Sequence, residues 1–311
     1  MVCRRQQNWT NSGCHAVSER GREKVRVLIT GGAGSMGREL AAAFVSQGDS
    51  IRVFDLPQCD FRPLEALGAE IVRGDITDTS LVRAAVEGMD AVVHLAALLP
   101  PASERDREQT FAINVEGTRR VVDAIRAEGG HAHLVFSSSV VTYGDTSREN
   151  PPVRVGHPQA PRDLYAESKV EAERVVLSAG VSYTVLRISG VAVPAFLNPP
   201  DVWPFQAEQR IEFVNRADAV SALLAATKRP LARNRVFIVA GGPSWQMRGR
   251  EYVEAILTAM DVPPEEARYL DHPGWFDWYD TRDAQAVLQF QRTTFPEFLE
   301  QLRRAVAEAL A

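Results

Sequence analysis

Two side chains four residues apart have the types needed to move a proton at a carbon-bound oxygen. They are Tyr165 and Lys169, within the segment Tyr-Ala-Glu-Ser-Lys of a helical stretch, and a spacing of four places both on one helix face. A free tyrosine has a pKa of about 10 and is a poor base at neutral pH. A neighbouring ammonium stabilises the phenolate and lowers that pKa. The spacing therefore predicts Tyr165 as a general acid/base that Lys169 assists.

A run of three serines, Ser137, Ser138 and Ser139, supplies hydroxyl groups directly after a predicted strand. The carboxyl ends of parallel strands are where sites form in open α/β sheets. A hydroxyl there can hold a substrate oxygen against the tyrosine. We expect one serine to do so and the other two to cap the strand end.

A glycine-rich turn predicts where a dinucleotide binds. Gly31, Gly34 and Gly37 are spaced three apart between the first predicted strand and a helix. Such a turn lets the backbone approach a pyrophosphate, and the helix N-terminus supplies N–H donors. Asp55 closes the second predicted strand, where a carboxylate accepts hydrogen bonds from ribose hydroxyls and repels a 2′-phosphate. No basic residue directly follows it, and Arg62 is the nearest one downstream, so we expect NAD rather than NADP.

These residues need a parallel sheet to position them, and the hydrophobic pattern of the sequence predicts one. Short apolar strands are predicted at 25–30, 51–54, 69–72, 91–95, 133–137 and 183–187. Helical stretches at 36–47, 114–127 and 163–177 separate several of them, which predicts a parallel sheet covered on both faces. The pattern weakens after residue 190. We therefore expect a disordered extension at 1–24, a cofactor domain at 25–190, and a smaller lobe over most of 191–311 from which some segments return to the main sheet.

Composition excludes several other classes of function. The 311 residues carry a net charge of −5, which argues against broad nucleic-acid or acidic-membrane binding. No apolar run approaches the roughly 18–20 residues that span a bilayer, and no secretory signal is evident. Cys3, Cys14 and Cys59 have no paired or metal-like spacing, so we expect a reducing, cytoplasmic location and no metal site. His94 is expected to pack as a hydrogen-bonded core histidine, and Asp218 to be structural.

Taken together, these motifs resemble the extended short-chain dehydrogenase/reductase superfamily, in its NAD-dependent epimerase/dehydratase branch. The matching pieces follow the order of that family. They are Thr30 to Gly37, Gly74-Asp75-Ile76, Val93-His94-Leu95-Ala96-Ala97, Asn114-Val115-Glu116-Gly117-Thr118, Ser137 to Gly144, Tyr165 to Lys169, and Phe213 to Val220.

The resemblance implies a doubly wound parallel (Rossmann) sheet with a smaller C-terminal substrate lobe, and a homodimer formed through the helices that begin near Asn114 and Asp163. It implies Ser139, Tyr165 and Lys169 as the catalytic residues, with Asp75 and Ile76 beside the adenine. The expected NAD-binding residues are Gly31, Gly34, Ser35, Met36, Gly37, Asp55, Asp75, Ile76, Leu95, Ala96, Ala97, Asn114, Tyr165 and Lys169.

Departures from the family pattern bear on the reaction. Val140 and Val141 follow Ser139 where the 4,6-dehydratases of the family carry an acidic pair, which argues against dehydration. Gly190 stands where nucleotide-sugar epimerases often have an asparagine that touches the diphosphate. Several arginines of the lobe could still meet an anionic group; they are Arg210, Arg216, Arg248 and Arg250.

The leading hypothesis is hydride transfer between NAD and a secondary alcohol or ketone of a sugar-like or sugar-nucleotide-like substrate, by dehydrogenation or by epimerisation. A dehydrogenase or reductase of a non-carbohydrate hydroxy or keto compound is one alternative. A non-catalytic NAD-binding regulator is another.

Overall fold

The structure, a computed structural model, describes residues 24–195 and 198–311, so most of the extension expected at 1–24 lies outside the described residues. The long strands are β1 (Arg26–Thr30), β2 (Ser50–Asp55), β3 (Glu70–Arg73), β4 (Ala91–His94), β5 (His133–Ser139), β6 (Tyr183–Ile188) and β10 (Arg235–Val239). The short strands are β7 (Gly190–Ala192), β8 (Arg210–Ile211), β9 (Phe213–Asn215) and β11 (Met247–Arg248). The α-helices are α1 (Ser35–Ser46), α2 (Arg62–Ala66), α3 (Thr79–Val86), α4 (Arg107–Phe111), α5 (Gly117–Ala127), α6 (Leu164–Leu177), α7 (Arg216–Lys228), α8 (Gly249–Ala259), α9 (Arg282–Leu288) and α10 (Phe295–Leu310).

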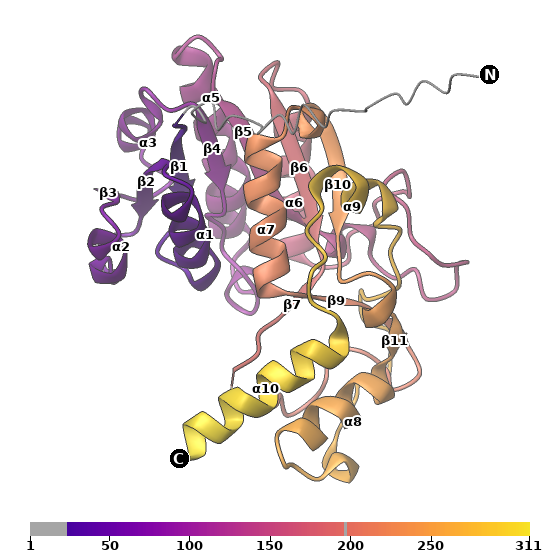
Figure 1. The fold of residues 1–311 in the computed structure, drawn as a ribbon. Coiled ribbons are helices and arrows are strands. Elements are labelled where there is room, and N and C mark those ends of the chain that lie inside the picture. Colours follow the sequence, from indigo (N-terminus) through magenta and orange to yellow (C-terminus); the bar gives the residue numbers. More distant parts are fainter. Residues whose placement is uncertain (1–23, 196–197) are drawn as a thin grey trace, which may run out of the picture.

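The long strands form one parallel sheet in the order β10-β6-β5-β4-β1-β2-β3 (Figure 1). The chain first moves outward from β1 to β3, then returns to the other side of β1 with β4 and continues to β10. The strand order therefore reverses between β1 and β4, which is where ligands bind in open α/β sheets. The predicted doubly wound parallel sheet is confirmed.

Alternation along β1 shows why both faces of the sheet are covered. Val27 and Ile29 belong to the core on one face, together with residues of α1 and α7. Leu28 points to the other face, where α3, α5 and α6 contribute to a second core. Successive strand residues point to opposite faces, so a continuous apolar strand such as this one must be buried on both sides.

The long helix expected at 114–127 differs in its first turns. The chain forms α4, then a π-helical turn at Ala112–Glu116, and only then α5. The side-chain amide of Asn114 makes two hydrogen bonds to the backbone of Leu98. Its Oδ1 accepts the Leu98 N–H at 2.7 Å, and its Nδ2 donates to the Leu98 carbonyl at 3.0 Å. Asn114 lies within the π-helical turn itself. Such turns are frequent at functional sites.

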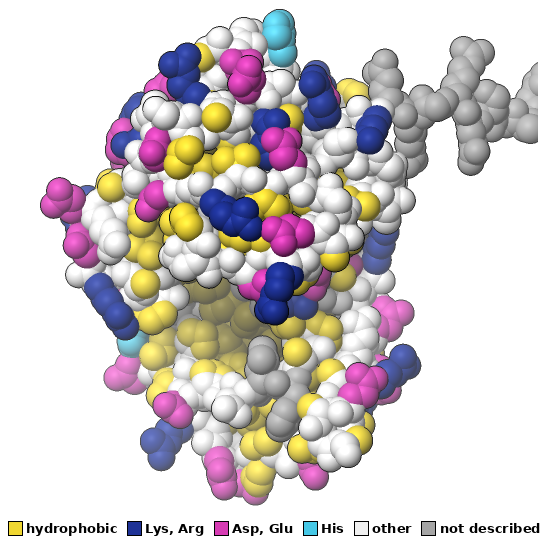
Figure 2. Space-filling model, turned by 90° about the vertical axis from the view of Figure 1, so that its left-hand side faces the viewer, with side chains coloured by type: hydrophobic (Ala, Val, Ile, Leu, Met, Phe, Trp, Pro, Cys, Tyr) yellow, Lys and Arg dark blue, Asp and Glu magenta, His cyan; other side chains and the backbone are white. Residues whose placement is uncertain are grey.

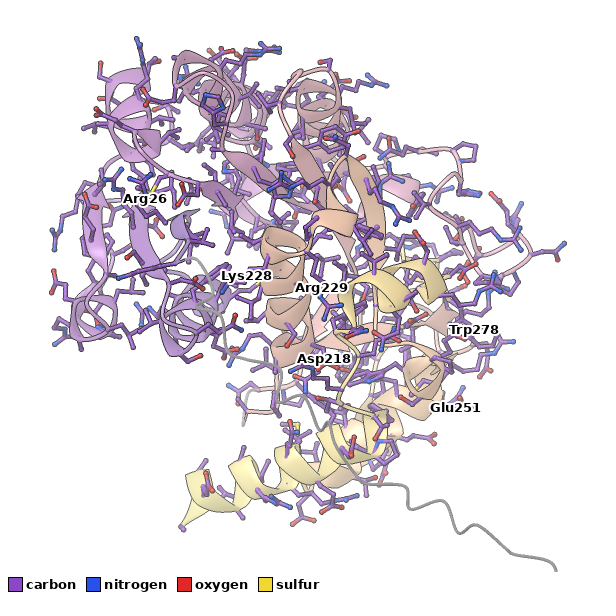
Figure 3. All side chains as sticks on the ribbon, turned by 45° about the horizontal axis from the view of Figure 1, so that its top comes forward. Arg26, Asp218, Lys228, Arg229, Glu251 and Trp278 are labelled. Carbon is purple, nitrogen blue, oxygen red and sulfur yellow. The ribbon has the colours of Figure 1, made fainter. Side chains whose placement is uncertain are left out.

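The C-terminal part of the chain divides between the main sheet and a smaller lobe. β10 pairs with β6 in the main sheet, and α7, whose two ends are marked by Asp218 and Lys228 in Figure 3, packs beside α1. The Asp218 carboxylate accepts the backbone N–H groups of Arg292 and Thr293, which joins α7 to the segment leading into α10. The lobe, with α8 and α10, has its own core and lies below the sheet in Figure 1. No helix in the two described ranges combines the length and hydropathy that crossing a membrane requires.

Two buried histidines should make the folded state sensitive to acid. His94 lies between the hydroxyls of Thr30 (2.6 Å) and Thr118 (3.0 Å), and burial, with Lys169 adding to it, lowers its pKa to about 3. Burial, with a contribution from Arg233, lowers the pKa of His133 to about 4. An unfolded histidine has a pKa of about 6.5.

We therefore expect unfolding free energy to be retained above pH 6.5 and to fall as the pH drops toward 4, because only the unfolded chain takes up these protons. At pH 5 each histidine should lower the free energy of unfolding by about 2 kcal/mol relative to pH 7. Urea denaturation at both values measures the loss. His133→Asn should reduce it, and the control His131→Asn, at an exposed histidine, should not; an equal loss in both variants would contradict the assignment.

Candidate active site

A cavity of about 590 Å³ opens at the carboxyl edge of the sheet, beside the point where the strand order reverses. One face of the molecule is hollowed, and hydrophobic side chains gather in the hollow (Figure 2). The wall brings together residues that follow five strands of the sheet. Of the residues predicted from the sequence, these line it: Gly31, Gly34, Ser35, Met36, Gly37, Asp55, Asp75, Ile76, Leu95, Ala96, Ala97, Ser139, Tyr165 and Lys169.

The glycine-rich turn between β1 and α1 is shaped for a close approach of backbone to ligand. Gly31 has a positive φ of 68°, and a Cβ on it would lie 2.7 Å from the backbone nitrogen of Ala96. A Cβ on Gly37 would lie 2.5 Å from Cα of Gly32, so only glycine lets α1 begin this close to the turn. None of the described side chains caps the first turn of α1, and that turn carries no acidic residue. Its N–H groups are therefore available to an anion such as a pyrophosphate.

Asp55 connects the end of β2 to this turn. Its Oδ2 accepts the Ala33 N–H at 2.9 Å, and its Oδ1 accepts the Leu56 N–H at 2.8 Å. The carboxylate lies on the cavity wall, where it can accept further hydrogen bonds from hydroxyl groups. Arg62 forms an ion pair with Asp60 (2.8 Å) and lies outside the cavity wall. The nearest downstream base therefore does not offset the charge of Asp55.

Tyr165 and Lys169 enter the cavity from the first turns of α6. The Lys169 ammonium donates to the Ser137 carbonyl at 2.9 Å and lies 5.6 Å from the centre of the Tyr165 ring. Burial lowers the pKa of Lys169 to about 8, with Glu173 opposing the shift. Burial also raises the pKa of the Tyr165 phenol, and Asp163 adds to this. The lowered phenol pKa expected from the sequence depends on the Lys169 ammonium together with the positive nicotinamide ring of a bound cofactor, and it stays a prediction. A second positive charge beside the ring is therefore needed to make the phenol a base near neutral pH.

The three serines at the end of β5 have different contacts. The Ser138 hydroxyl donates to the Glu173 carboxylate, and the Ser137 carbonyl accepts from Lys169. The Ser139 hydroxyl lies on the cavity wall, and its contacts within the described part of the chain are two long ones, each 3.3 Å, to the Ile188 carbonyl and the Val141 N–H. Ser139 is therefore the serine whose hydroxyl is most easily redirected to a ligand oxygen.

Asn114 departs from its expected place. It is 2% exposed and is not part of the cavity wall. Besides binding the backbone of Leu98, its amide donates to the Ser168 hydroxyl at 2.9 Å. Its polar atoms are thus used within the protein, because the π-helical turn directs them at the segment after β4. In the structure Asn114 holds Leu98 against α6, and its contact with a cofactor stays a prediction.

Sequence reasoning missed two residues near the catalytic group. Glu173 is 1% exposed and pairs with Arg187 at 2.7 Å, one helical turn beyond Lys169. The repeat of four from Tyr165 through Lys169 to Glu173 was the available signal. Ser189, at the end of β6, is 5% exposed on the cavity wall, and its hydroxyl has no hydrogen-bond partner among the described residues. No sequence signal marked it.

The two buried serines at the site should respond differently to truncation. Ser189→Ala should leave the melting temperature of the ligand-free protein unchanged or slightly raised, because the lost hydroxyl has no partner. Ser138→Ala should lower stability by about 1–3 kcal/mol, since a hydrogen bond to a charged group is lost. Differential scanning calorimetry of both variants is the measurement. A larger loss for Ser189→Ala than for Ser138→Ala would show that the Ser189 hydroxyl is satisfied.

Comparison with known protein families finds a match over most of the chain. A model of the NAD dependent epimerase/dehydratase family matches residues 27–240. A short-chain dehydrogenase/reductase superfamily protein from Agrobacterium tumefaciens, solved with bound NAD, has a TM-score of 0.78 and 25% identity, covering 92% of this chain and 98% of that one.

Curated relatives have different activities. A 3 beta-hydroxysteroid dehydrogenase/Delta 5→4-isomerase of Mycobacterium tuberculosis is 35% identical over 175 residues, which cover 53% of this chain and 47% of that protein. A UDP-glucose 4-epimerase of Lactobacillus helveticus is 33% identical over 175 residues, covering 54% and 52%. Sterol demethylase protein B of Methylococcus capsulatus is 30% identical over 250 residues, covering 78% and 68%. The chain spans about half the length of the first of these relatives.

Proposed function

This chain belongs to the NAD-dependent epimerase/dehydratase family, and from that premise we propose that it moves hydride between NAD and a secondary alcohol or the corresponding ketone, with Tyr165 as general acid/base. The observation that carries the proposal is that Tyr165, Lys169 and Ser139 converge on the one cavity that also contains the glycine turn and Asp55. Unrelated surface residues would not share one wall.

The cavity fits a dinucleotide along its length. The free N–H groups of α1 and the glycines of the turn would hold the pyrophosphate, and Asp55 would accept hydrogen bonds from the adenosine ribose. When bound, NAD supplies the hydride acceptor and a positively charged ring. The residues at the opposite end of the wall, Ser139, Tyr165 and Lys169, are then the ones beside the reacting carbon.

The proton chemistry belongs to residues of this chain. In the direction of oxidation, the Tyr165 phenolate takes the hydroxyl proton while Ser139 holds the substrate oxygen. Lys169 stabilises the phenolate from beneath the ring, and its own position is fixed by the Ser137 carbonyl. In the direction of reduction, the Tyr165 hydroxyl returns the proton to the oxygen. Val140 and Val141 are buried and carry no acid, so the elimination of water has no second proton donor at these positions.

Turnover by the purified full chain tests the proposal. NAD and a panel of sugar nucleotides, sugars and non-carbohydrate secondary alcohols would be followed by NADH absorbance, which reports net dehydrogenation. Substrates deuterated at the carbinol carbon would report epimerisation, because the epimeric product would form without net NADH and would still carry the deuterium. If the protein bound NAD but transferred no hydride to or from any compound of the panel, the result would favour a non-catalytic NAD-binding regulator. The homodimer remains a prediction that sedimentation can check.

A further inference from the structure

We propose that the substrate end of the cavity takes an uncharged, largely apolar secondary alcohol or ketone and excludes nucleoside-diphosphate sugars. This inference rests on the hydride transfer proposed above. The wall that carries Tyr165 and Ser139 also carries five large apolar side chains, those of Leu98, Leu99, Ile113, Ile188 and Val191. Such a wall binds a ligand more tightly when the ligand buries apolar surface against it.

A diphosphate carries two negative charges, which a protein binds with cations or free N–H groups. Among the described residues that line the cavity, Lys169 is the one cation, and its ammonium is held by the Ser137 carbonyl beneath the Tyr165 ring. The other charged residues of the wall are Asp55 and Asp75, which belong to the adenosine end in the proposed binding mode and supply no positive charge. In the binding mode proposed above, the N–H groups of the glycine turn and of α1 serve the pyrophosphate of NAD. A second diphosphate beside Tyr165 and Ser139 would therefore meet no further cation on the described wall, and its charges would stay largely uncompensated.

The helix N-terminus beside the catalytic tyrosine is already used by carboxylates. Glu104 accepts the N–H groups of Leu164 at 2.9 Å and Tyr165 at 3.1 Å. Asp163 accepts the N–H of Ala166 at 2.7 Å. A helix N-terminus attracts anions, but α6 satisfies that preference with its own acidic partners. A second anion arriving next to Tyr165 would be repelled by them.

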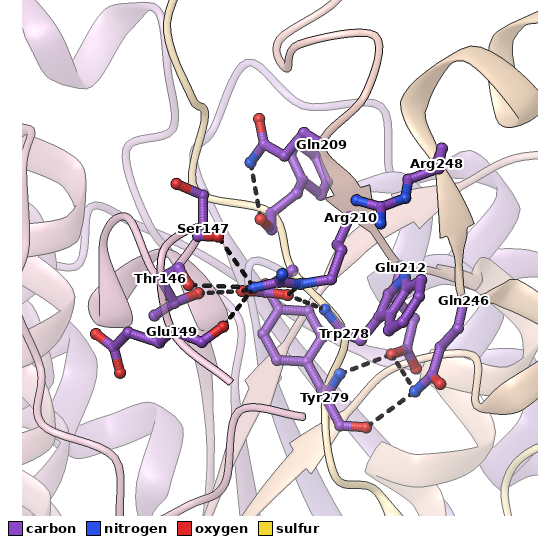
Figure 4. Close-up of polar contacts among 12 residues, drawn as sticks. Thr146, Ser147, Glu149, Gln209, Arg210, Glu212, Gln246, Arg248, Trp278 and Tyr279 are labelled. Atoms are coloured by element: carbon purple, nitrogen blue, oxygen red, sulfur yellow. Dashed lines mark hydrogen bonds and ion pairs between the residues drawn. The ribbon is translucent and has the colours of Figure 1, made fainter. Parts of the chain in front are cut away.

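The arginines that the sequence left open for an anionic group contact protein groups instead. Arg210 pairs with Asp277 at 2.5 Å and donates to the Glu149 carbonyl at 2.9 Å (Figure 4). The other three behave similarly: Arg216 pairs with Glu39 at 2.5 Å, Arg248 donates to the Glu208 carbonyl at 2.9 Å, and Arg250 pairs with the Glu208 carboxylate at 3.1 Å. None of the four is part of the cavity wall.

Gly190, between the wall residues Ser189 and Val191, is closed off by two aromatic rings. A Cβ on Gly190 would lie 2.6 Å from the Phe213 ring and 2.8 Å from the Phe276 ring. The two rings pack on each other with centroids 4.7 Å apart. No polar side chain can therefore project from position 190 toward a ligand, and the space beside it is apolar.

Two measurements on the full chain test this inference. Calorimetric titration of UDP into the NAD-loaded protein should show no binding at millimolar UDP, and binding with a Kd below 1 mM, roughly −4 kcal/mol, would overturn the inference without reference to turnover. In the NADH assay, cyclohexanol, 4-tert-butylcyclohexanol and a 3β-hydroxysteroid should be oxidised with a higher kcat/KM than UDP-glucose. A preference for UDP-glucose would overturn the substrate class and leave the hydride transfer intact. Absence of turnover with every compound, despite NAD binding, would instead contradict the proposed function.

A pair of variants at one wall position sharpens the test. Leu99 lies on the wall but is 56% exposed, so replacing it should not disturb the core. Leu99→Lys should lower kcat/KM for the apolar alcohols by about 10- to 100-fold, through KM rather than kcat, because a charge now faces the substrate. Leu99→Met keeps the wall apolar and should lower kcat/KM far less than Leu99→Lys does. Equal kcat/KM in the two variants would contradict an apolar substrate at this wall.

Discussion

Replacing Tyr165 by phenylalanine is expected to lower kcat by about 10²- to 10⁴-fold, the range for loss of a positioned general acid/base. The change removes one hydroxyl and keeps the ring that packs 5.6 Å from the Lys169 ammonium. The Kd of NADH should be nearly unchanged, because the glycine turn and Asp55 remain in place. Single-turnover rates measure the first quantity, and fluorescence titration of NADH measures the second.

Tyr183→Phe is the matched control for this experiment. Tyr183 begins β6, its hydroxyl makes no hydrogen bond to the described residues, and it is not part of the cavity wall. It should retain full kcat. If Tyr165→Phe kept activity comparable to Tyr183→Phe, the phenol would not be the proton donor and acceptor, and the proposed mechanism would fail.

Replacing Asp55 by asparagine should change the choice of cofactor. Asparagine keeps an oxygen that can accept the Ala33 N–H, which Asp55 now accepts at 2.9 Å, but it removes the charge. Hydrogen bonds to a charged group contribute about 1.5–3 kcal/mol each, so kcat/KM with NADH should fall by about 10-fold or more. Loss of the repulsion should raise kcat/KM with NADPH. We expect the NADH/NADPH ratio of kcat/KM to fall by about 100-fold.

Asp90→Asn provides the control, because this carboxylate pairs with Arg26 just before β4 and does not line the cavity. Its ratio of kcat/KM for the two cofactors should equal that of the unmodified protein. Efficient use of NADPH by the unmodified protein would refute the role given to Asp55, whatever the variants do.

The sequence predicted the sheet and most of the cavity wall because these depend on local patterns. A strand of alternating faces, a glycine turn before a helix, and a spacing of four within a helix each fix geometry over a few residues. Tyr165, Lys169 and Asp55 could therefore be placed without knowing any distant contact. Asn114 was expected at the cofactor because its motif was recognised, whereas the structure shows that its amide is used by Leu98.

By itself, the sequence determined the order of strands and helices, the glycine turn, and the helix face that carries the phenol and the amine. Only the tertiary structure decided which charges stay available to a ligand. Glu104 caps a helix 60 residues away, Arg210 finds its carboxylate 67 residues away, and the rings of Phe213 and Phe276 close over Gly190. These pairings follow from which groups are buried together. A buried charge must find a partner, and no local spacing records which partner that will be.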